Sequence, residues 1–581
     1  MPNDSTLIIR GGTVIDGTGG APFEADVAIA GGKITQIGKV TGKADREIDA
    51  RGQIVTPGFI DPHSHYDAQV TWSGSITPTS WNGVTTTMIG NCGVGFAPCR
   101  PDQRDMLVKL MEGVEDIPEV VLTEGLPWNW ESFPEYLNVL DARRYDLDVA
   151  TQVPHAAVRV FVMGRRGADL EPSTAADQAA MARITVEGIR AGALGFSTSR
   201  TINHKTLAGE SIPTLRSEES ELGAIADALR GIDAGWMQVI SDFDDPDPEF
   251  DMLRRLVGRS NRPMAISILQ RDSKPEEWRR IVGRIAEANA DGLPMLGQVL
   301  TRPTGVMLGF EISQNPFLRR PSWEKIAHLS FAQKLEMLRQ PEFRAQILTE
   351  TCADPVLKKR VNSWNRIFKL GDPADYEPAE DRSVAAEAAR QGRDPQEVVY
   401  DWLLENNGKA ILYRPLSNYT YGNLDTVADM IGHPNTIVGL GDGGAHVGVL
   451  TDASAITYML THWTRDRTRG PKKPLEWAIR RLTSDSANAI GLRDRGVIAP
   501  GYKADINVID YANLRICAPE VLYDLPAGGR RLVQRTQGYT ATIVSGVPVH
   551  LNNEATGELP GRLIRGGHAA PLRQPVQKAA E

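Results

Sequence analysis

The central part of the chain alternates short apolar runs with longer segments in which apolar residues recur at helical spacing. Eight of the apolar runs have the length of buried β-strands: residues 58–61, 85–91, 148–153, 193–197, 236–240, 263–269, 295–300 and 436–440. Helical stretches, for example residues 175–191 and 218–232, lie between them. Eight strands that alternate with helices predict an α/β fold, a TIM-type (β/α)8 barrel over residues 58–494.

Both ends of the chain carry a different pattern, in which short strand-like runs alternate with glycine turns. Such runs occur at residues 7–9, 13–15, 27–29 and 34–37, and again at 504–509 and 541–544. We expect the two ends to form one composite β-sandwich domain from residues 1–57 and 495–565. Residues 566–581 are rich in Gly, Ala, Pro and Gln, which predicts a disordered tail.

The seventh and eighth predicted strands are separated by a gap much longer than an ordinary loop. This gap contains Trp323, Trp364 and many charged residues. We interpret residues 302–423 as an inserted lid or accessory subdomain.

Composition excludes several classes of function. The net charge is −9 and no long basic run is present, so nucleic acid is not expected as a partner. Four widely spaced cysteines do not resemble a disulfide framework. The first residues lack the pattern of a signal peptide, and no apolar run is long enough for a transmembrane helix. A cytoplasmic protein is therefore expected; its oligomeric state is left open.

The first candidate site follows the first predicted barrel strand, where His63 and His65 are two residues apart. On an extended chain these side chains point to the same side, so both imidazoles can bind one ion such as zinc. In a barrel this strand end lies at the face where active sites form. The alternative is that both histidines are simply exposed after a strand.

Two further candidates also follow predicted strands. Asp442 lies in the glycine-rich segment after the eighth strand, and its carboxylate could bind a metal and accept a proton. Cys92 ends the second strand and could bind a metal as a thiolate. An Asx-turn at Asp442 and a buried structural role for Cys92 are the alternatives.

In this order, the motifs resemble the amidohydrolase superfamily. Within it, Gly90-Asn91-Cys92-Gly93 and Gly195-Phe196-Ser197-Thr198 are similar to the N-acyl-D-amino-acid deacylases, or D-aminoacylases. The resemblance covers nearly the whole chain. It implies hydrolysis of an N-acyl amide, metal ligation by His63, His65 and Cys92, and a catalytic, metal-binding aspartate at Asp442.

The chain departs from that family at several positions. The family has two more metal histidines at the ends of strands five and six, whereas residues 235–241 and 266–270 contain none. Ile268 replaces the second of these histidines, Gln270 a substrate-binding lysine, and Ile202 a substrate tyrosine. We therefore expect one divalent ion per chain, Zn²⁺ or another metal, rather than two.

Other polar residues near the expected active face are candidates for substrate binding. They are His155 after the third strand, Arg200 and His204 after the fourth, and His446 after the eighth. The alternative for each histidine is an ordinary loop position in which the backbone satisfies its ring. Arg159, Arg200 and Arg271 are the candidates to bind a substrate carboxylate in place of the missing lysine.

These features predict a metal-dependent hydrolase of a linear amide, with Asp442 moving the proton. Hydrolysis of another C–N bond, such as a cyclic amide or carbamate, and a non-catalytic scaffold are the alternatives. Gln270 and Ile202 remove a charge and a hydroxyl, so we expect a bulkier or less charged amide than an N-acetyl-D-amino acid. Phe310, Phe317 and Trp323 of the insertion are expected to wall a larger apolar pocket.

Overall fold

The computed structural model describes residues 5–232 and 234–571. At its centre lies an eight-stranded, wholly parallel sheet with the order β6-β7-β8-β9-β10-β11-β12-β16. The eight strands are β6 (Phe59–Asp61), β7 (Val84–Ile89), β8 (Asp148–Pro154), β9 (Gly195–Arg200), β10 (Trp236–Ser241), β11 (Met264–Ser267), β12 (Met295–Val299) and β16 (Thr436–Val438). All eight strands predicted from the sequence are confirmed.

The first and last strands meet beyond their carboxyl ends, which nearly closes the barrel. Ser64 and Gly443 form a parallel bridge, and the N–H of His65 donates to the carbonyl of Gly443 over 2.8 Å. The N–H of Asp442 donates to the carbonyl of His63 over 3.1 Å. The segments that carry the predicted metal residues are therefore bonded directly to each other.

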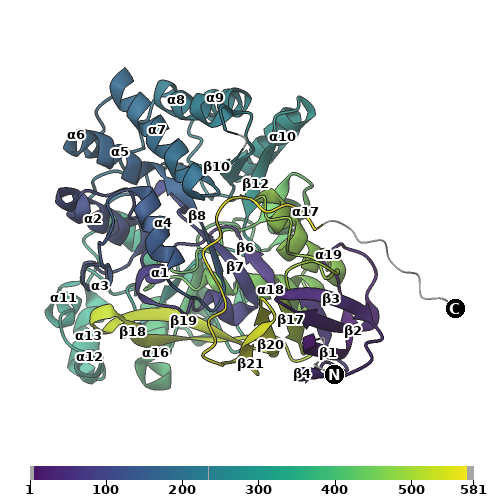
Figure 1. Cartoon of the computed structure of the whole chain (residues 1–581). Coiled ribbons are helices and arrows are strands. Elements are labelled where there is room, and N and C mark those ends of the chain that lie inside the picture. Colours follow the sequence, from purple (N-terminus) through teal and green to yellow (C-terminus); the bar gives the residue numbers. More distant parts are fainter. Residues whose placement is uncertain (1–4, 233, 572–581) are drawn as a thin grey trace.

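Helices cover the outside of the barrel, where their apolar faces pack against strands that are buried on both sides (Figure 1). Those between successive strands include α2 (Arg104–Glu115), α4 (Phe133–Asp141), α5 (His155–Met163), α7 (Ala175–Ala191), α8 (Glu219–Arg230), α9 (Pro246–Ser260), α10 (Glu277–Ala290) and α17 (Asp425–Gly432). After β16 follow α18 (Ala455–Thr461) and α19 (Leu475–Arg480). The helices predicted at 175–191 and 218–232 correspond to α7 and α8.

Strands from both ends of the chain form one sheet beside the barrel, as the composite pattern predicted. From the N-terminal side come β1 (Ser5–Val14), β2 (Phe23–Ala30), β3 (Lys33–Gly38), β4 (Ala44–Asp49) and β5 (Ile54–Pro57). From the C-terminal side come β17 (Ile506–Ile509), β20 (Tyr539–Val544), β21 (Val547–Leu551) and β22 (Glu554–Ala555). The two sets meet where β5 pairs antiparallel with β17.

The C-terminal part of the chain departs from the expected organisation in three ways. Residues 515–537 leave the sheet as a hairpin of β18 (Arg515–Leu525) and β19 (Gly529–Gln537), which runs beneath the barrel in Figure 1. Beyond β22 the chain packs on the barrel, where Leu563 bridges Val149 of β8. Disorder is also the wrong prediction for the start of the tail, because His568 hydrogen-bonds Gly491 and lies 2.7 Å from Asp494. Residues 572–581 lie outside the described residues.

The insertion after β12 has a hydrophobic core of its own. A three-stranded sheet of β13 (Gly305–Leu308), β15 (Leu412–Pro415) and β14 (Phe368–Lys369) is surrounded by helices. The helices are α11 (Pro321–Ile326), α12 (Phe331–Leu338), α13 (Pro341–Thr349), α14 (Pro355–Val361), α15 (Val384–Gln391) and α16 (Pro395–Gly408). They gather at the lower left of Figure 1.

The aromatic residues of the insertion lie inside this core. Phe310, Phe317 and Trp323 are each less than 5% exposed, and Phe310 stacks on Trp323 with ring centroids 5.9 Å apart. The expectation that they wall a pocket over the barrel mouth is wrong, because they stabilise the insertion itself.

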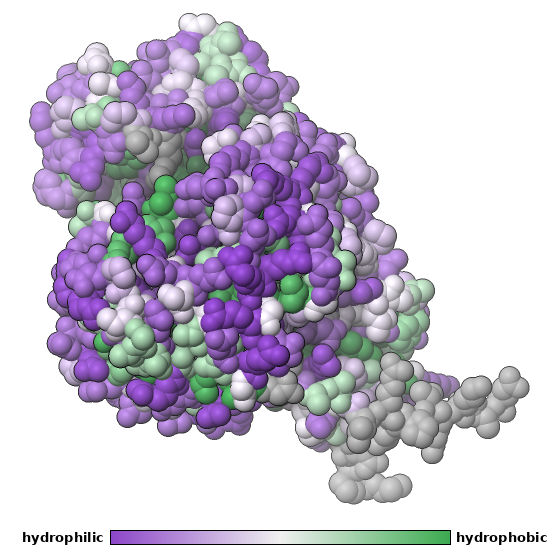
Figure 2. All heavy atoms as spheres, turned by 90° about the horizontal axis from the view of Figure 1, so that it is seen from above, coloured by the Kyte–Doolittle hydropathy of each residue, from purple (hydrophilic) through white to green (hydrophobic). Residues whose placement is uncertain are grey.

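Across residues 5–232 and 234–571, none of the helices combines the length and the apolar character needed to span a bilayer. Figure 2 shows a face that is mainly hydrophilic, with apolar side chains in small separate patches.

Candidate metal centre

His63 and His65 enter the barrel mouth directly after β6. Asp61, the last residue of β6, accepts the backbone N–H of His63 through Oδ1 over 3.1 Å, which holds the turn. Between the histidines, Ser64 points the other way and donates to the carbonyl of Met88 on β7. The two imidazoles therefore lie on one side of the chain, as their spacing predicted, and their ring centroids are 5.3 Å apart.

The two imidazoles are oriented through their Nδ1 atoms. Nδ1 of His63 lies 2.9 Å from Oε1 of Gln298 on β12, and Nδ1 of His65 lies 3.3 Å from Oε1 of Glu115 at the end of α2. With Nδ1 protonated towards these oxygens, the lone pair of each ring is on Nε2. Burial lowers the pKa of His63 to about 4, so its imidazole is neutral at pH 7 and able to bind a metal.

Cys92 approaches the histidines from the end of β7. Its backbone adopts a left-handed conformation, with φ of 54°, and its N–H donates to Oε1 of Gln238 over 2.9 Å. This turn places Sγ 3.3 Å from Nε2 of His63. Ligand atoms of His63, His65 and Cys92 all lie within 4.8 Å of one another, and all three residues are buried.

Asp442 joins this group from the glycine-rich segment after β16. Its Oδ1 lies 3.5 Å from Nε2 of His63 and 3.7 Å from Nε2 of His65. Its φ of 42° is left-handed, and the neighbouring glycines leave room for Tyr66 and Thr79, which any side chain at Gly443 would meet. Asp442 thus faces the same point as both Nε2 atoms.

The donor set fits a divalent cation. Two neutral imidazoles, a thiolate and a carboxylate are ligands that zinc and similar ions accept together. Burial, with Asp442, Glu115 and Asp67 nearby, raises the pKa of Cys92 well above its usual range, and burial raises the pKa of Asp442 to about 6. Acidic groups that are costly to ionise together are typical of a site whose positive charge comes from a bound ion.

Glu115 was not recognised in the sequence. It is 1% exposed, and it lies between His65 and His446, with Oε2 3.7 Å from Nε2 of His446. Burial, together with Asp442 and Asp67, raises its pKa well above the usual range. Its burial could have been predicted from the sequence, because Glu115 follows Val108 and Met111 at helical spacing and so lies on the buried face of α2.

Two of the predicted substrate-binding residues lie at this site. His446 is partly exposed, with 30% of its side chain accessible, next to Glu115. His204 bonds Oγ of Ser199 through Nδ1, over 2.9 Å. Burial and the proximity of His446 and His63 lower the pKa of His204 to about 3. Both rings are therefore neutral polar groups beside the metal residues.

The other two predicted substrate-binding residues are bound elsewhere. His155 is fully buried, with Nδ1 2.9 Å from Oγ1 of Thr198 and Nε2 3.1 Å from Oε1 of Glu221. Arg200 pairs with Glu249 over 2.5 Å and donates to the carbonyl of Ser217. Both side chains are therefore bound to neighbouring elements of the barrel, His155 to Glu221 of α8 and Arg200 to Glu249 of α9.

Of the two segments that lack histidines, the first has Gln238 in the middle of β10 and the second has Ile268 directly after β11. Gln238 on β10 holds the N–H of Cys92, as described above, and donates to Oγ of Ser267 on β11 over 3.2 Å. Ile268 is 1% exposed and packs in the barrel core. The two further metal histidines of the D-aminoacylase pattern are thus missing from residues 235–241 and 266–270.

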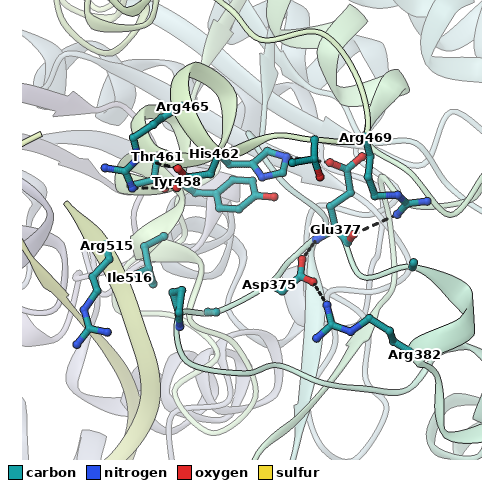
Figure 3. A pocket seen from close by; sticks show the side chains of 15 residues that line it. Asp375, Glu377, Arg382, Tyr458, Thr461, His462, Arg465, Arg469, Arg515 and Ile516 are labelled. Carbon is teal, nitrogen blue, oxygen red and sulfur yellow. Dashed lines mark hydrogen bonds and ion pairs between the residues drawn. The ribbon is translucent and has the colours of Figure 1, made fainter. Parts of the chain in front are cut away.

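A cavity of about 410 Å³ lies away from these residues (Figure 3). It opens between the insertion, the end of α18 with its π-helical turn His462–Asp466, and the start of β18. The charges around it are paired: Asp375 accepts from Arg382 over 2.6 Å, and Glu377 lies 2.9 Å from His462. Its lining does not include the His63, His65 and Cys92 group.

A family model described as the amidohydrolase family matches residues 46–550, which include the barrel, the insertion and the strands β5, β17 and β20 of the composite sheet. The chain belongs to the amidohydrolase family. The N-acyl-D-aspartate deacylase of Alcaligenes xylosoxydans xylosoxydans is a relative of this amidohydrolase, 25% identical over 577 residues, 99% of this chain and 97% of that protein. The resemblance to the D-aminoacylases is thus confirmed.

Solved structures confirm the fold of this amidohydrolase. The crystal structure of D-aminoacylase matches with a TM-score of 0.63 at 21% identity, over 97% of this chain and 100% of that one. The N-acyl-D-glutamate deacylase from Bordetella bronchiseptica, complexed with zinc and a phosphonate inhibitor, matches with a TM-score of 0.62 at 22% identity, over 97% and 99%. The predicted fold class is therefore correct.

Proposed function

We propose that this amidohydrolase hydrolyses a linear N-acyl amide at one divalent ion, Zn²⁺ in the first instance, held by His63, His65, Cys92 and Asp442. The observation that carries the proposal is the convergence of two Nε2 atoms, one Sγ and one carboxylate oxygen at the mouth of the barrel. The relatives named above act on N-acyl-D-amino acids, which makes a small N-acylated molecule the substrate class to test first.

The chain's own residues divide the chemistry between them. An ion in this site would polarise the amide carbonyl and lower the pKa of a water to about 7. Asp442, with a pKa raised to about 6 by burial, is suited to take a proton from the attacking water and return it to the leaving nitrogen. His204 and His446, neutral and beside the ligands, are placed to donate a hydrogen bond to the developing oxyanion.

The contacts at the substrate positions support an uncharged amide. Gln270, at the position of the family's lysine, is 1% exposed, and its Oε1 accepts the N–H of Thr420. Ile202, at the position of the tyrosine, is 61% exposed and offers no hydroxyl. Neither residue can therefore bind a substrate carboxylate.

The arginines weighed as replacements are also occupied. Arg159 pairs with Glu221 over 2.6 Å, Arg200 with Glu249, and Arg271 with Glu277. A guanidinium that already neutralises a buried or half-buried carboxylate is not free for a second one. We therefore expect a substrate without a carboxylate beside the scissile amide; the size of its acyl group stays open, because the insertion's aromatic residues do not wall the site.

The decisive experiment combines metal analysis with a substrate panel. Purified protein is analysed for bound metals, then assayed with N-acetyl-D-amino acids, longer N-acyl-D-amino acids, uncharged N-acyl amides and cyclic amides, before and after chelation. Hydrolysis of linear amides that chelation abolishes and Zn²⁺ restores supports the proposal. Activity confined to cyclic amides, or full activity without metal, contradicts it.

A further inference from the structure

Glu115 occupies an unusual position for an acidic residue. Within the described part of the chain, no lysine or arginine is ion-paired with this buried carboxylate; the ionisable groups in contact with it are His65, at 3.3 Å, and His446, at 3.7 Å. A buried carboxylate lowers the stability of the fold unless a hydrogen bond or an ion pair compensates for its lost hydration. For Glu115 the groups that can do so are the imidazoles of His65 and His446.

The contact with His65 has a direct geometric consequence. Nδ1 of His65 is buried and has no hydrogen-bond partner in the described structure, so the oxygen of Glu115 at 3.3 Å is the acceptor in reach. Nε2 of the same ring faces Asp442, at 3.7 Å. A proton on Nδ1, directed at Glu115, leaves the lone pair of Nε2 directed at the point where the four ligand side chains converge.

We propose that Glu115 is a positioning residue for the metal centre: its carboxylate accepts the Nδ1–H of His65 and holds Nε2 of that ring towards the ion. This inference rests on the proposed function, because it needs the metal centre described there. Hydrogen bonds of active sites are often long before the site is loaded and tighten afterwards, which fits a 3.3 Å contact.

The two histidine ligands differ in this respect, and the difference provides the test. His63 is oriented by the neutral amide of Gln298, over 2.9 Å, whereas His65 is oriented by a carboxylate. A carboxylate acceptor makes the imidazole a stronger ligand than an amide does, and removing such a partner typically weakens metal affinity 10- to 100-fold. Glu115→Gln gives His65 an amide acceptor like the one that His63 has in Gln298, whereas Glu115→Ala removes the acceptor of His65.

The matched control lies one turn earlier on the same helix. Glu112 makes a different contact: its Oε1 accepts the backbone N–H of Glu119 over 2.9 Å. Glu112→Gln removes one negative charge from α2 without touching a histidine. It separates loss of charge on the helix from loss of the contact with His65.

The experiment measures metal binding directly. Metal-free wild type, Glu115→Gln, Glu115→Ala and Glu112→Gln are titrated with Zn²⁺ in competition with a chromophoric chelator, and the visible spectrum of each Co²⁺ form is recorded. We expect the Kd for Zn²⁺ to rise about 10- to 100-fold in Glu115→Ala and less in Glu115→Gln, with altered Co²⁺ spectra in both. Glu112→Gln should match the wild type.

The outcomes separate the inference from the proposed function. Wild type that binds no ion overturns the proposed function, and the positioning role with it. Wild type that binds Zn²⁺ tightly, together with Glu115 variants of unchanged Kd and unchanged Co²⁺ spectrum, overturns the positioning role alone. If Glu115→Ala does not fold by circular dichroism, Glu115→Gln decides, since it keeps the size of the side chain.

Discussion

The backbone N–H of Cys92 donates a hydrogen bond to Oε1 of Gln238 over 2.9 Å. This contact joins the turn after β7 to the middle of β10, three strands away in the barrel order. Because it holds the left-handed turn of Cys92, it also determines where Sγ lies relative to His63. A strand without a predicted metal ligand of its own thus helps to position Cys92, which is one.

Replacing Gln238 by Ala should weaken both folding and metal binding. The N–H of Cys92 would stay buried without an acceptor, which costs about 1–3 kcal/mol of unfolding free energy. Urea denaturation of the metal-free proteins and the Zn²⁺ titration measure the two effects. Gln391→Ala, at an exposed position of α15, is the control. If Gln238→Ala had the stability and the Kd of the wild type, the turn at Cys92 would not depend on its hydrogen bond to Gln238.

The protein should bind one divalent ion per chain. The reason is that residues 235–241 and 266–270 contain no histidine that could supply a second set of ligands. Elemental analysis after gel filtration measures the ratio, and the melting temperature should fall when the ion is removed, because ligand binding stabilises the folded state. Two ions per chain at full occupancy would show that residues outside the expected set bind the second one.

Asp442→Asn should fold and lose most of its activity. Loss of a proton-transfer group typically lowers kcat about 10²- to 10⁴-fold. Asp442→Asn also removes the negative charge with which the carboxylate would bind the ion, which lowers kcat further. Steady-state kinetics with Zn²⁺ in excess measure the change in kcat. Asp429→Asn, exposed on α17, should keep wild-type kinetics. A folded Asp442→Asn protein with most of its kcat would mean that this carboxylate only shapes the turn.

The enzyme should prefer uncharged N-acyl amides over N-acetyl-D-amino acids by about tenfold or more in kcat/KM. One lost charge pair at a partly desolvated site is worth about 1.5–3 kcal/mol, and 1.4 kcal/mol corresponds to a factor of ten. Parallel measurements with matched acyl chains give the ratio. A preference for the carboxylate-bearing substrates would point to a cation that reaches the site only when substrate is bound.

The ion pairs that Glu377 of the insertion makes with His462 and Arg467 should lose their contribution to stability at low pH. Burial raises the pKa of Glu377, but hydrogen bonds from His462 and Arg467 outweigh burial and lower it to about 2. A carboxylate with a lowered pKa contributes stability that is present above its unfolded pKa of about 4.3 and is lost as the pH falls towards 2. The contribution at neutral pH is on the order of 3 kcal/mol.

Glu377→Gln tests this anchor. The variant should be less stable than the wild type at pH 7, and the difference should shrink as the pH falls below about 4. Thermal denaturation between pH 7 and pH 3 measures it, and Glu405→Gln, exposed in the same insertion, provides the control. A difference that stays constant over this range would assign the effect to packing rather than charge.

The sequence by itself determined the barrel and predicted that His63 and His65 lie together at its mouth. Each barrel strand is a short run that periodicity reveals, and His63 and His65 converge because residues two apart on an extended chain share a side. Cys92 and Asp442 could be placed because each follows a strand directly, and parallel strands end at the same face. All these relationships are local, or follow from the strand order alone.

The tertiary structure alone decided the rest. Glu115, Gln238 and Gln298 reach the centre from α2, β10 and β12, and nothing in their local sequence states which atoms they contact. The same holds for Arg200 and His155, which sit near the right strand ends but pair with Glu249 and Glu221. Local periodicity determines on which face of a helix or strand a side chain lies. The residue that it contacts there depends on how elements distant in the chain pack against each other.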